Sequence, residues 1–259
     1  MWTLTHLITM IPTFVVFFGI AFLVGFLLRG KSEIIRSIPL QIIAAILIIM
    51  EVIKQTRSFG ENGYDLYSLP FHFCSLFIYI LPLHAFYRFK PRPIIDSLTV
   101  MLTASLFFNM LVMPANIYGE GAILDMFKSF SSFHTVVFHN LVVLYMMLTI
   151  SLKAYKMNLK RDVIVSVIFL AAYVIIATVL SYSLKTNFHN LYQCNVEFIW
   201  NFVLKLKEKI GWIIQAAYVF VLFIATLIFG LGSYFAIFGL DKLISFISGK
   251  CKKKTPTTV

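Results

Sequence analysis

The chain has 259 residues, of which 60% are hydrophobic and 13% are charged, and its formal net charge is +11. A soluble domain of this size carries roughly 25% charged residues, so the composition excludes a water-soluble fold. The basic residues lie between and after apolar runs, which is typical of a membrane protein rather than of a nucleic-acid-binding protein. The three cysteines form neither a CxxC pair nor an even disulfide framework. We therefore expect the bilayer, rather than cross-links, to determine the fold.

Seven apolar runs predict an all-α polytopic membrane protein with seven transmembrane helices. A hydrocarbon core about 30 Å thick requires about 20 apolar residues per helix. The first run is interpreted as a retained helix because it lacks the basic flank and cleavage site of a signal peptide. A single transmembrane domain is expected over residues 1–240, followed by a basic cytoplasmic tail over 241–259. The predicted spans are 9–28, 38–56, 69–87, 94–115, 132–152, 162–184 and 211–240.

Two segments near the C-terminus depart from this simple pattern. The run at 211–240 is longer than one bilayer thickness, so we expect this helix to tilt or its end, from Phe235 to Leu240, to leave the membrane. The segment from Phe198 to Ile210 alternates apolar and basic residues and is predicted to be an amphipathic helix at the outer interface.

The orientation follows from the positions of Lys and Arg. Fifteen of them lie on one side of the predicted spans and seven on the other. Because cytoplasmic loops are enriched in basic residues, the N-terminus is expected outside and the C-terminus in the cytoplasm of a cell membrane. The four lysines between residues 185 and 209 oppose this rule. The basic tail at 250–254 is expected to contact anionic lipid, and Cys251 within it is assigned no catalytic role.

Polar residues gather in the outer half of the predicted bundle. Such residues are costly inside apolar spans and normally face the bundle interior. The inner half holds little beyond Gln41, His84, Asp96, Ser97 and Thr99. A through-pore would require polar groups along its whole length, so we predict a polar cavity that opens to the outer leaflet. For each residue alone, hydrogen bonds that join helices are the competing interpretation. The candidates are Glu51, His72, Cys74, Ser75, Asn109, His134, His139, Asn140 and Asn187.

A cysteine and a histidine in this group lie at matching depth. At a rise of 1.5 Å per residue, Cys74 lies roughly 8 Å and His139 roughly 10 Å below the start of its span. An imidazole that takes the proton of a thiol makes it a nucleophile suited to acyl transfer. His72 points about 200° away from Cys74 on a helix and lines an adjoining wall or lies at the interface. The alternative interpretation is that Cys74 has no chemical role and is a small buried hydrophobic residue.

Other assignments of these residues are weaker. Glu51 orients a histidine, pairs with Lys54 or Arg57, or lies at the interface. A metal site built from Glu51 and the histidines lacks ligand spacing of the HExxH kind, so we predict no metal and no cofactor. His134 and His189 are nearer water than His139. His6 and His84 lie far from the cluster and are not included in it.

Three short motifs resemble those of the YwaF-type integral membrane proteins of bacteria. Residues 69–76 read LPFHFCSL, followed by LPL at 81–83, and are similar to the LPLHLCSL segment of that family. Residues 138–142, FHNLV, and 185–188, KTNF, are similar to two further landmarks. At 187–189 the chain reads NFH where the bacterial pattern has Asn-Tyr before a Pro-rich stretch, which weakens the assignment of this loop.

The resemblance implies a location in the bacterial plasma membrane and an activity. The YwaF-type proteins resemble the eukaryotic transmembrane acyltransferase that acts on ether phospholipids, and more remotely the androgen-induced hydrolases of fatty acid esters. Carried over to the matching positions of this chain, the resemblance implies that the nucleophile is Cys74 and the base is His139. The implied reaction uses a membrane phospholipid as acyl donor, and asparagines at 109, 140 or 187 donate hydrogen bonds to the oxyanion. Whether the acceptor is a lysolipid, a lipoprotein amine or water stays open.

Two other classes of function remain open. A polar outer pocket would also suit a binding or transport protein for a small or lipidic solute. The sequence shows no internal repeat and no matched pair of broken helices, which are the usual marks of a carrier. A structural or assembly protein would use the same polar residues to join its helices.

Overall fold

The computed structural model describes residues 2–60, 63–88, 92–155 and 157–252, and its regular structure is almost entirely helical. Among the described residues, one sheet is present, made of the two short antiparallel strands β1 (Phe59–Gly60) and β2 (Gly63–Tyr64). The helical elements are α1 (Leu4–Leu27), α2 (Glu33–Arg57), the 3-10 turns η1 (Leu66–Ser68) and η2 (Phe73–Leu76), α3 (Phe77–Phe86), α4 (Arg92–Val112), η3 (Pro114–Asn116), α5 (Glu120–Leu124), α6 (Phe130–Ser151), α7 (Leu159–Leu184), η4 (Phe188–Asn190), α8 (Glu197–Ile210) and α9 (Trp212–Lys252).

Local sequence signals fix several helix starts. Thr3 and His6 form a reciprocal capping box at the start of α1. Ser32 caps α2, and Glu33 follows it in the first turn, where a negative charge is favourable. The Asn158 side chain accepts a hydrogen bond from the backbone amide of Arg161 at the start of α7. These caps replace backbone partners that the first turn of a helix lacks.

Within the described residues, six helices are long and apolar enough to cross a membrane: α1, α2, α4, α6, α7 and residues 212–240 of α9. The third predicted span, 69–87, is different. Its first part turns through Pro70 and η2, and only the ten residues of α3 form an α-helix. Ten residues rise about 15 Å, which is half of the hydrocarbon thickness. The α3 segment therefore does not meet the length of a spanning helix, and the seventh crossing stays a prediction.

Hydrogen bonds fix the relative directions of the helices around α2. At one end of α2 the Gln41 amide donates to Ala85 O near the end of α3, and Arg36 donates to Leu152 O after α6. Towards the other end, Gln55 donates to Ser68 O ahead of α3. Glu51 lies beside His134 near the start of α6. Hence α3 and α6 both run antiparallel to α2 and parallel to each other.

The bundle has two chemically distinct ends. We call the end that holds Glu51, His134 and His139 the histidine end, and the opposite end, where α7 begins, the Asp162 end. The first residues of α1 lie at the histidine end, since Trp2 donates to Leu111 O and His6 contacts Tyr118 O. This end carries several of the polar residues that the sequence analysis assigned to the outer half, and the polar cavity itself stays a prediction.

The Asp162 end is more polar than the sequence indicated. The Asp162 side chain is fully buried and accepts hydrogen bonds from Ser97 of α4, Tyr234 of α9 and Tyr155. Arg161 also pairs with this carboxylate, at 2.9 Å. Because a buried charge needs such partners, this network joins three helices at one point.

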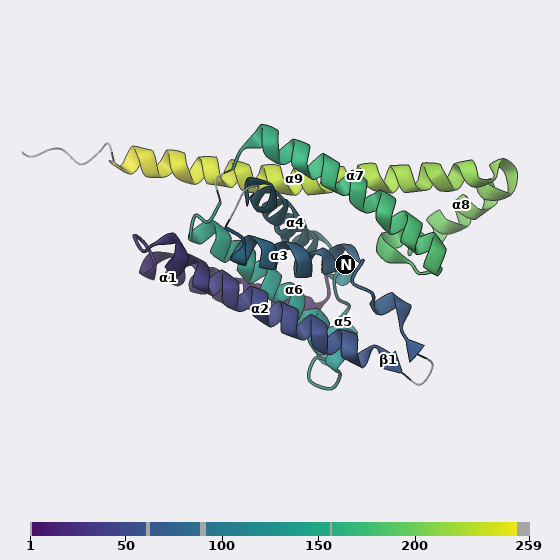
Figure 1. Ribbon diagram of the computed structural model, residues 1–259, viewed down its shortest axis with the longest axis horizontal. Helices are drawn as coiled ribbons and strands as arrows, with labels where there is room; N and C mark the ends of the chain where they lie inside the picture. Colours follow the sequence, from purple (N-terminus) through teal and green to yellow (C-terminus); the bar gives the residue numbers. More distant parts are fainter. Residues whose placement is uncertain (1, 61–62, 89–91, 156, 253–259) are drawn as a thin grey trace, which may run out of the picture.

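The helix α4 is the most deeply buried of the long helices, and α1 and α9 bury only narrow stripes. In Figure 1, α9 runs along the longest axis of the molecule and α7 crosses α9. The helix α8 folds back beside the first turns of α9. The expected amphipathic helix at 198–210 is confirmed as α8, although its place at the membrane interface stays a prediction. The helix α9 continues without a break past Leu240. Four basic residues used for orientation, Lys90, Lys156, Lys253 and Lys254, lie outside the described residues.

Candidate functional site at the histidine end

Glu51 is the centre of a buried polar cluster. Its carboxylate accepts from Lys54 Nζ at 3.1 Å and from the Gln55 amide at 2.5 Å. His134 Nε2 lies 3.4 Å from Glu51 Oε2, and the His134 ring stacks on Phe138. Glu51 thus pairs with Lys54 and orients a histidine at once, two roles that the sequence left as alternatives. The cluster ties α2 to α6 at this end of the bundle.

His139 presents a free nitrogen inside the bundle. Its Nδ1 donates to the backbone oxygen of Thr135 at 2.6 Å, one turn back on α6. This bond leaves the proton on Nδ1 and the lone pair on Nε2. Nε2 is buried and has no hydrogen-bond partner among the described residues. A neutral imidazole held in this tautomer is arranged to accept a proton.

Cys74 lies on the 3-10 turn η2, where the chain enters α3. The Ser75 amide donates to His72 O at 2.8 Å and closes this turn, and the Ser75 side chain is buried. His72 Nε2 donates to Tyr67 O at 2.9 Å, so its ring is held towards the preceding loop. The Cys74 thiol is free and half-buried against the main hydrophobic core. Pro70 and the short turn account for this departure from the predicted straight helix.

Contacts with α2 relate the positions of Cys74 and His139. Ser68, six residues before Cys74, accepts a hydrogen bond from Gln55. His134, five residues before His139, lies beside Glu51. Both candidate residues therefore follow segments that contact the same end of α2. No hydrogen bond joins the two side chains in the part of the chain that the structure describes, so their pairing stays a prediction.

The three asparagines have different surroundings. The Asn140 amide donates to Tyr118 OH and to Val136 O, and it lines a groove of about 370 Å³ between α1 and α6. The Asn187 side chain holds its own loop together, because it accepts from the amides of residues 192 and 193 and donates to Asn195. Asn109 is half-buried on α4, and its side-chain amide makes no hydrogen bond within the described ranges.

Two residues next to Cys74 were not among the sequence candidates. The His189 ring stacks on Phe73 with 5.1 Å between centroids, and the Tyr173 hydroxyl donates to Phe71 O. His189 Nε2 is 3.1 Å from Thr226 Oγ1 of α9. His189 was interpreted as a residue near water, but its loop folds back onto the segment that carries Cys74. No pattern in the sequence signals this, since the contact depends on how a loop packs.

Burial controls the titration of the loop groups near this site. The pKa of His189 falls from 6.5 to about 4, chiefly because burial disfavours the charged ring and secondly because His72 is nearby. Burial likewise raises the pKa of Tyr118 to about 12. Both side chains are therefore neutral at pH 7.

His6 and His84 differ from each other in position. His6 is fully buried, and its Nε2 donates to the oxygen of Tyr118, whose ring lies 6.3 Å from that of His139. The expectation that His6 lies far from the cluster is therefore wrong. His84 lies near the Asp162 end, where its Nδ1 is 2.6 Å from Tyr145 OH. Within the described residues, no group of three or more His, Cys, Asp or Glu side chains is arranged to hold a metal ion.

The fold and this site define an all-helical, multi-pass membrane protein with a buried histidine cluster. The model of the TMEM164 family matches residues 1–232, which include every helix except the last part of α9. The chain therefore belongs to the TMEM164 family. No curated protein and no solved structure matches it. The similarity to the YwaF-type proteins remains a resemblance carried by the three motifs.

Proposed function

We propose that this protein is a membrane-embedded acyltransferase that acts on phospholipid acyl chains through Cys74 and His139. The observation that carries the proposal is the free, buried Nε2 of His139, in the tautomer that accepts a proton. The proposal is supported because Cys74 and His139 both follow segments that contact the same end of α2. Membership in the TMEM164 family is consistent with the resemblance that first suggested this pair.

The reaction has two steps. In the first, His139 Nε2 takes the thiol proton, and the Cys74 thiolate attacks the ester carbonyl of a phospholipid. The carbon–oxygen bond of the ester breaks, a thioester forms on Cys74, and the departing lysolipid oxygen takes the proton from His139. In the second, an acceptor hydroxyl or amine attacks the thioester, and its proton passes through His139 back to the Cys74 sulfur. Water as the acceptor would make the protein a hydrolase.

The surrounding polar groups supply orientation in this scheme. Asn109 is the strongest candidate for the oxyanion donor, because its amide is free while those of Asn140 and Asn187 are occupied. Asn140 keeps an unpartnered buried Oδ1 within the described residues, which suits a donor group of the substrate. His72, Ser75, Glu51 and His134 line or support the same end of the bundle.

The membrane context completes the proposal. The site lies in a polar cavity open to the outer leaflet of a bacterial plasma membrane, with the N-terminus outside and the C-terminus in the cytoplasm. The excess of Lys and Arg on one side supports this orientation. The donor is a membrane phospholipid, the acceptor a lysolipid or a lipoprotein, and anionic lipid contacts the basic tail.

Intact-protein mass spectrometry tests the covalent step. The purified protein is incubated with phospholipid under conditions that preserve thioesters. We expect an adduct of acyl-chain mass that hydroxylamine removes, that is absent in Cys74→Ala and that is retained in Cys194→Ala, since Cys194 is the other half-buried free cysteine of the described chain. His139→Ala should form the adduct more slowly, because His139 activates the thiol in the first step. Absence of the adduct in wild type, with bound lipid confirmed and no acceptor added, would contradict the mechanism. A binding or transport protein would then be the better assignment.

A further inference from the structure

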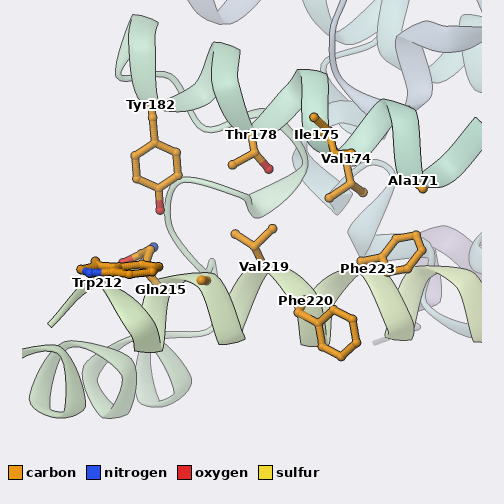
Figure 2. A pocket seen from close by; sticks show the side chains of 11 residues that line it. Ala171, Val174, Ile175, Thr178, Tyr182, Trp212, Gln215, Val219, Phe220 and Phe223 are labelled. Atoms are coloured by element: carbon orange, nitrogen blue, oxygen red, sulfur yellow. The ribbon is translucent and has the colours of Figure 1, made fainter. Parts of the chain in front are cut away.

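A second candidate site lies apart from the histidine cluster, between α7 and α9. The two helices diverge around a groove of about 530 Å³, and Figure 2 shows side chains from both helices facing into it. Its volume is within the range of ordinary ligand pockets. Its walls are almost wholly apolar. The lining residues are Ala171, Val174, Ile175, Thr178, Tyr182, Trp212, Gln215, Ala216, Val219, Phe220 and Phe223.

Three polar groups interrupt this apolar surface: Tyr182 and Gln215 at the end that holds Trp212, and Thr178 one helical turn further along α7. Gln215 is only 9% exposed, yet its Nε2 and Oε1 have no hydrogen-bond partner among the described residues. Thr178 Oγ1 on α7 is likewise buried and has no hydrogen-bond partner among the described residues. The Tyr182 hydroxyl points down towards Gln215 and Trp212 in Figure 2, and it interacts with the Gln215 side chain.

Unpartnered groups of this kind are costly. An amide removed from water without a compensating hydrogen bond costs on the order of 2–7 kcal/mol, depending on the reference environment. Gln215 lies in the first turn of α9 and Tyr182 in the last turn of α7, so this polar part of the groove is at one end of both spanning helices, yet the amide atoms of Gln215 are buried there. Gln215 offers two N–H donors and an acceptor oxygen, and the Tyr182 hydroxyl can meet only part of this capacity, which leaves a place for one more partner. A hydroxyl group both accepts and donates.

We propose that this groove binds a single-chain lipid that carries a free hydroxyl beside its chain, with the hydroxyl at Gln215 and Thr178 and the chain along Val219 and Phe223. The occupant is a lipid because the groove opens on the outer surface of two spanning helices, where Ile175 is 65% and Phe220 62% exposed. At about 30 Å³ for a group the size of a water molecule, the groove holds roughly 18 such groups, enough for one acyl chain.

The groove adjoins the segment that carries Cys74. Val174 belongs to a small buried cluster against which Val219 and Phe223 of the groove pack, and Phe73 and Leu76, which flank Cys74, pack against the same cluster. A lipid in the groove therefore lies one layer of side chains from the proposed nucleophile. This link rests on the proposed function: the lipid hydroxyl would be the acyl acceptor. The binding site itself does not depend on that chemistry.

Photo-crosslinking of the full-length protein tests the site. The Cys74→Ala variant is used so that no turnover consumes the probe. The probe is a lysophosphatidylcholine with a photoactivatable group in its acyl chain, and the matched probe carries a methyl ether in place of its free hydroxyl. We expect the first probe to label peptides within 171–182 and 212–223. Labelling by the methyl ether is expected to be at least fivefold weaker, because an ether donates no hydrogen bond.

Variants of the polar groups complete the test. Gln215→Leu and Thr178→Val are expected to reduce labelling by the hydroxyl probe to the level of the methyl ether. Val221→Leu, on the lipid-facing surface of α9 outside the groove, is the control and should leave labelling unchanged. Without added lipid, Gln215→Leu should raise the Tm in detergent, since it removes an unpartnered amide. That measurement separates lost binding from lost folding.

The outcomes distinguish this proposal from the proposed function. Equal labelling of the parent protein and Gln215→Leu by the hydroxyl probe, or equal labelling by the two probes, would overturn the lipid site even if Cys74 forms a thioester. Labelling that depends on Gln215, with no thioester on Cys74 in the wild type, would uphold the site and refute the covalent mechanism.

Discussion

The histidines of this protein differ in which ring nitrogen is left free. His72 and His6 each donate from Nε2 to a backbone oxygen, and His189 Nε2 meets the Thr226 hydroxyl. His139 uses Nδ1 for its backbone contact, so its Nε2 keeps the lone pair. This difference sets His139 apart from His6, His72 and His189 as the proposed base. His84 at the Asp162 end and His134 beside Glu51 also keep an Nε2 without a hydrogen-bond partner among the described residues.

At this scale the prediction concerns His139→Gln. Glutamine fills a similar volume but does not accept and return a proton, and loss of a general base typically slows a reaction by about 10²–10⁴-fold. We expect a loss of that size in the rate of acyl transfer between phospholipid and lysolipid, followed by mass spectrometry of the lipids. His6→Gln, whose native ring makes a structural hydrogen bond, should retain activity within a few-fold. Equal losses in both variants would remove His139 from the base role.

At the level of elements, α1 and α6 approach each other closely at Gly25. A Cβ atom at this position would lie 1.9 Å from Ser151 Oγ and 3.0 Å from the Ser151 backbone oxygen. Ser151 also donates across the interface to Ala21 O. Small residues allow such contact between membrane helices.

Gly25→Ala is therefore expected to separate α1 from α6. Overpacking of this kind typically costs about 1–3 kcal/mol, which should appear as a lower Tm in detergent. Gly19→Ala is the matched control on the same helix, because a Cβ there meets nothing within 4 Å. Alanine is a better helix former than glycine, so the control should keep or raise the Tm. A Tm for Gly25→Ala as high as that of the control would contradict the close contact.

The loop around η4 gives a prediction on pH. The folded state lowers the pKa of His189 from 6.5 to about 4 by burial. Between these values the unfolded chain binds a proton that the folded chain does not, so stability must fall as the pH falls. We expect the Tm to drop between pH 7 and pH 4.5. His189→Phe keeps the ring contact with Phe73 and removes the titration, so its drop should be smaller; an unchanged drop would refute the assignment.

For the whole molecule, Asp162 joins helices that are distant in sequence. Its carboxylate is fully buried and binds Ser97 and Tyr234 at 2.6 Å each, so α4, α7 and α9 meet there. The histidine end depends on the same three helices, since α9 supplies Thr226 to His189 and α4 carries Asn109. The Asp162 network therefore holds the frame in which the candidate site is built.

Removal of this carboxylate should destabilise the whole bundle. Asp162→Ala leaves Arg161 without this carboxylate and three hydroxyl groups, those of Ser97, Tyr155 and Tyr234, without this acceptor. Breaking a buried ion pair typically costs about 3–5 kcal/mol. We expect a large loss of Tm and of monodisperse protein in detergent. Asp125→Ala removes an exposed pair with Lys128 and should change stability by less than about 1 kcal/mol. Equal Tm values for the two variants would show that the network is dispensable.

The class of the protein could be predicted from sequence alone. Six of the seven expected spans are long apolar helices in the structure, because the length of an apolar run is a local property that the bilayer thickness converts directly into a helix. The short α3 was missed because Pro70 and a 3-10 turn replace helix within an apolar run. Hydropathy alone does not distinguish a continuous apolar helix from an apolar turn followed by a short helix.

Only the tertiary structure decided which polar residues meet. The sequence found Glu51, His134 and His139 because each interrupts an apolar span. It missed His189 beside Phe73, the Asp162 network and the unpartnered Gln215, because these depend on how a loop folds back and how distant helices cross. Sequence thus determined how much of the chain is buried in lipid, since burial follows composition. Partners across the bundle followed from helix packing, which is a property of the whole chain.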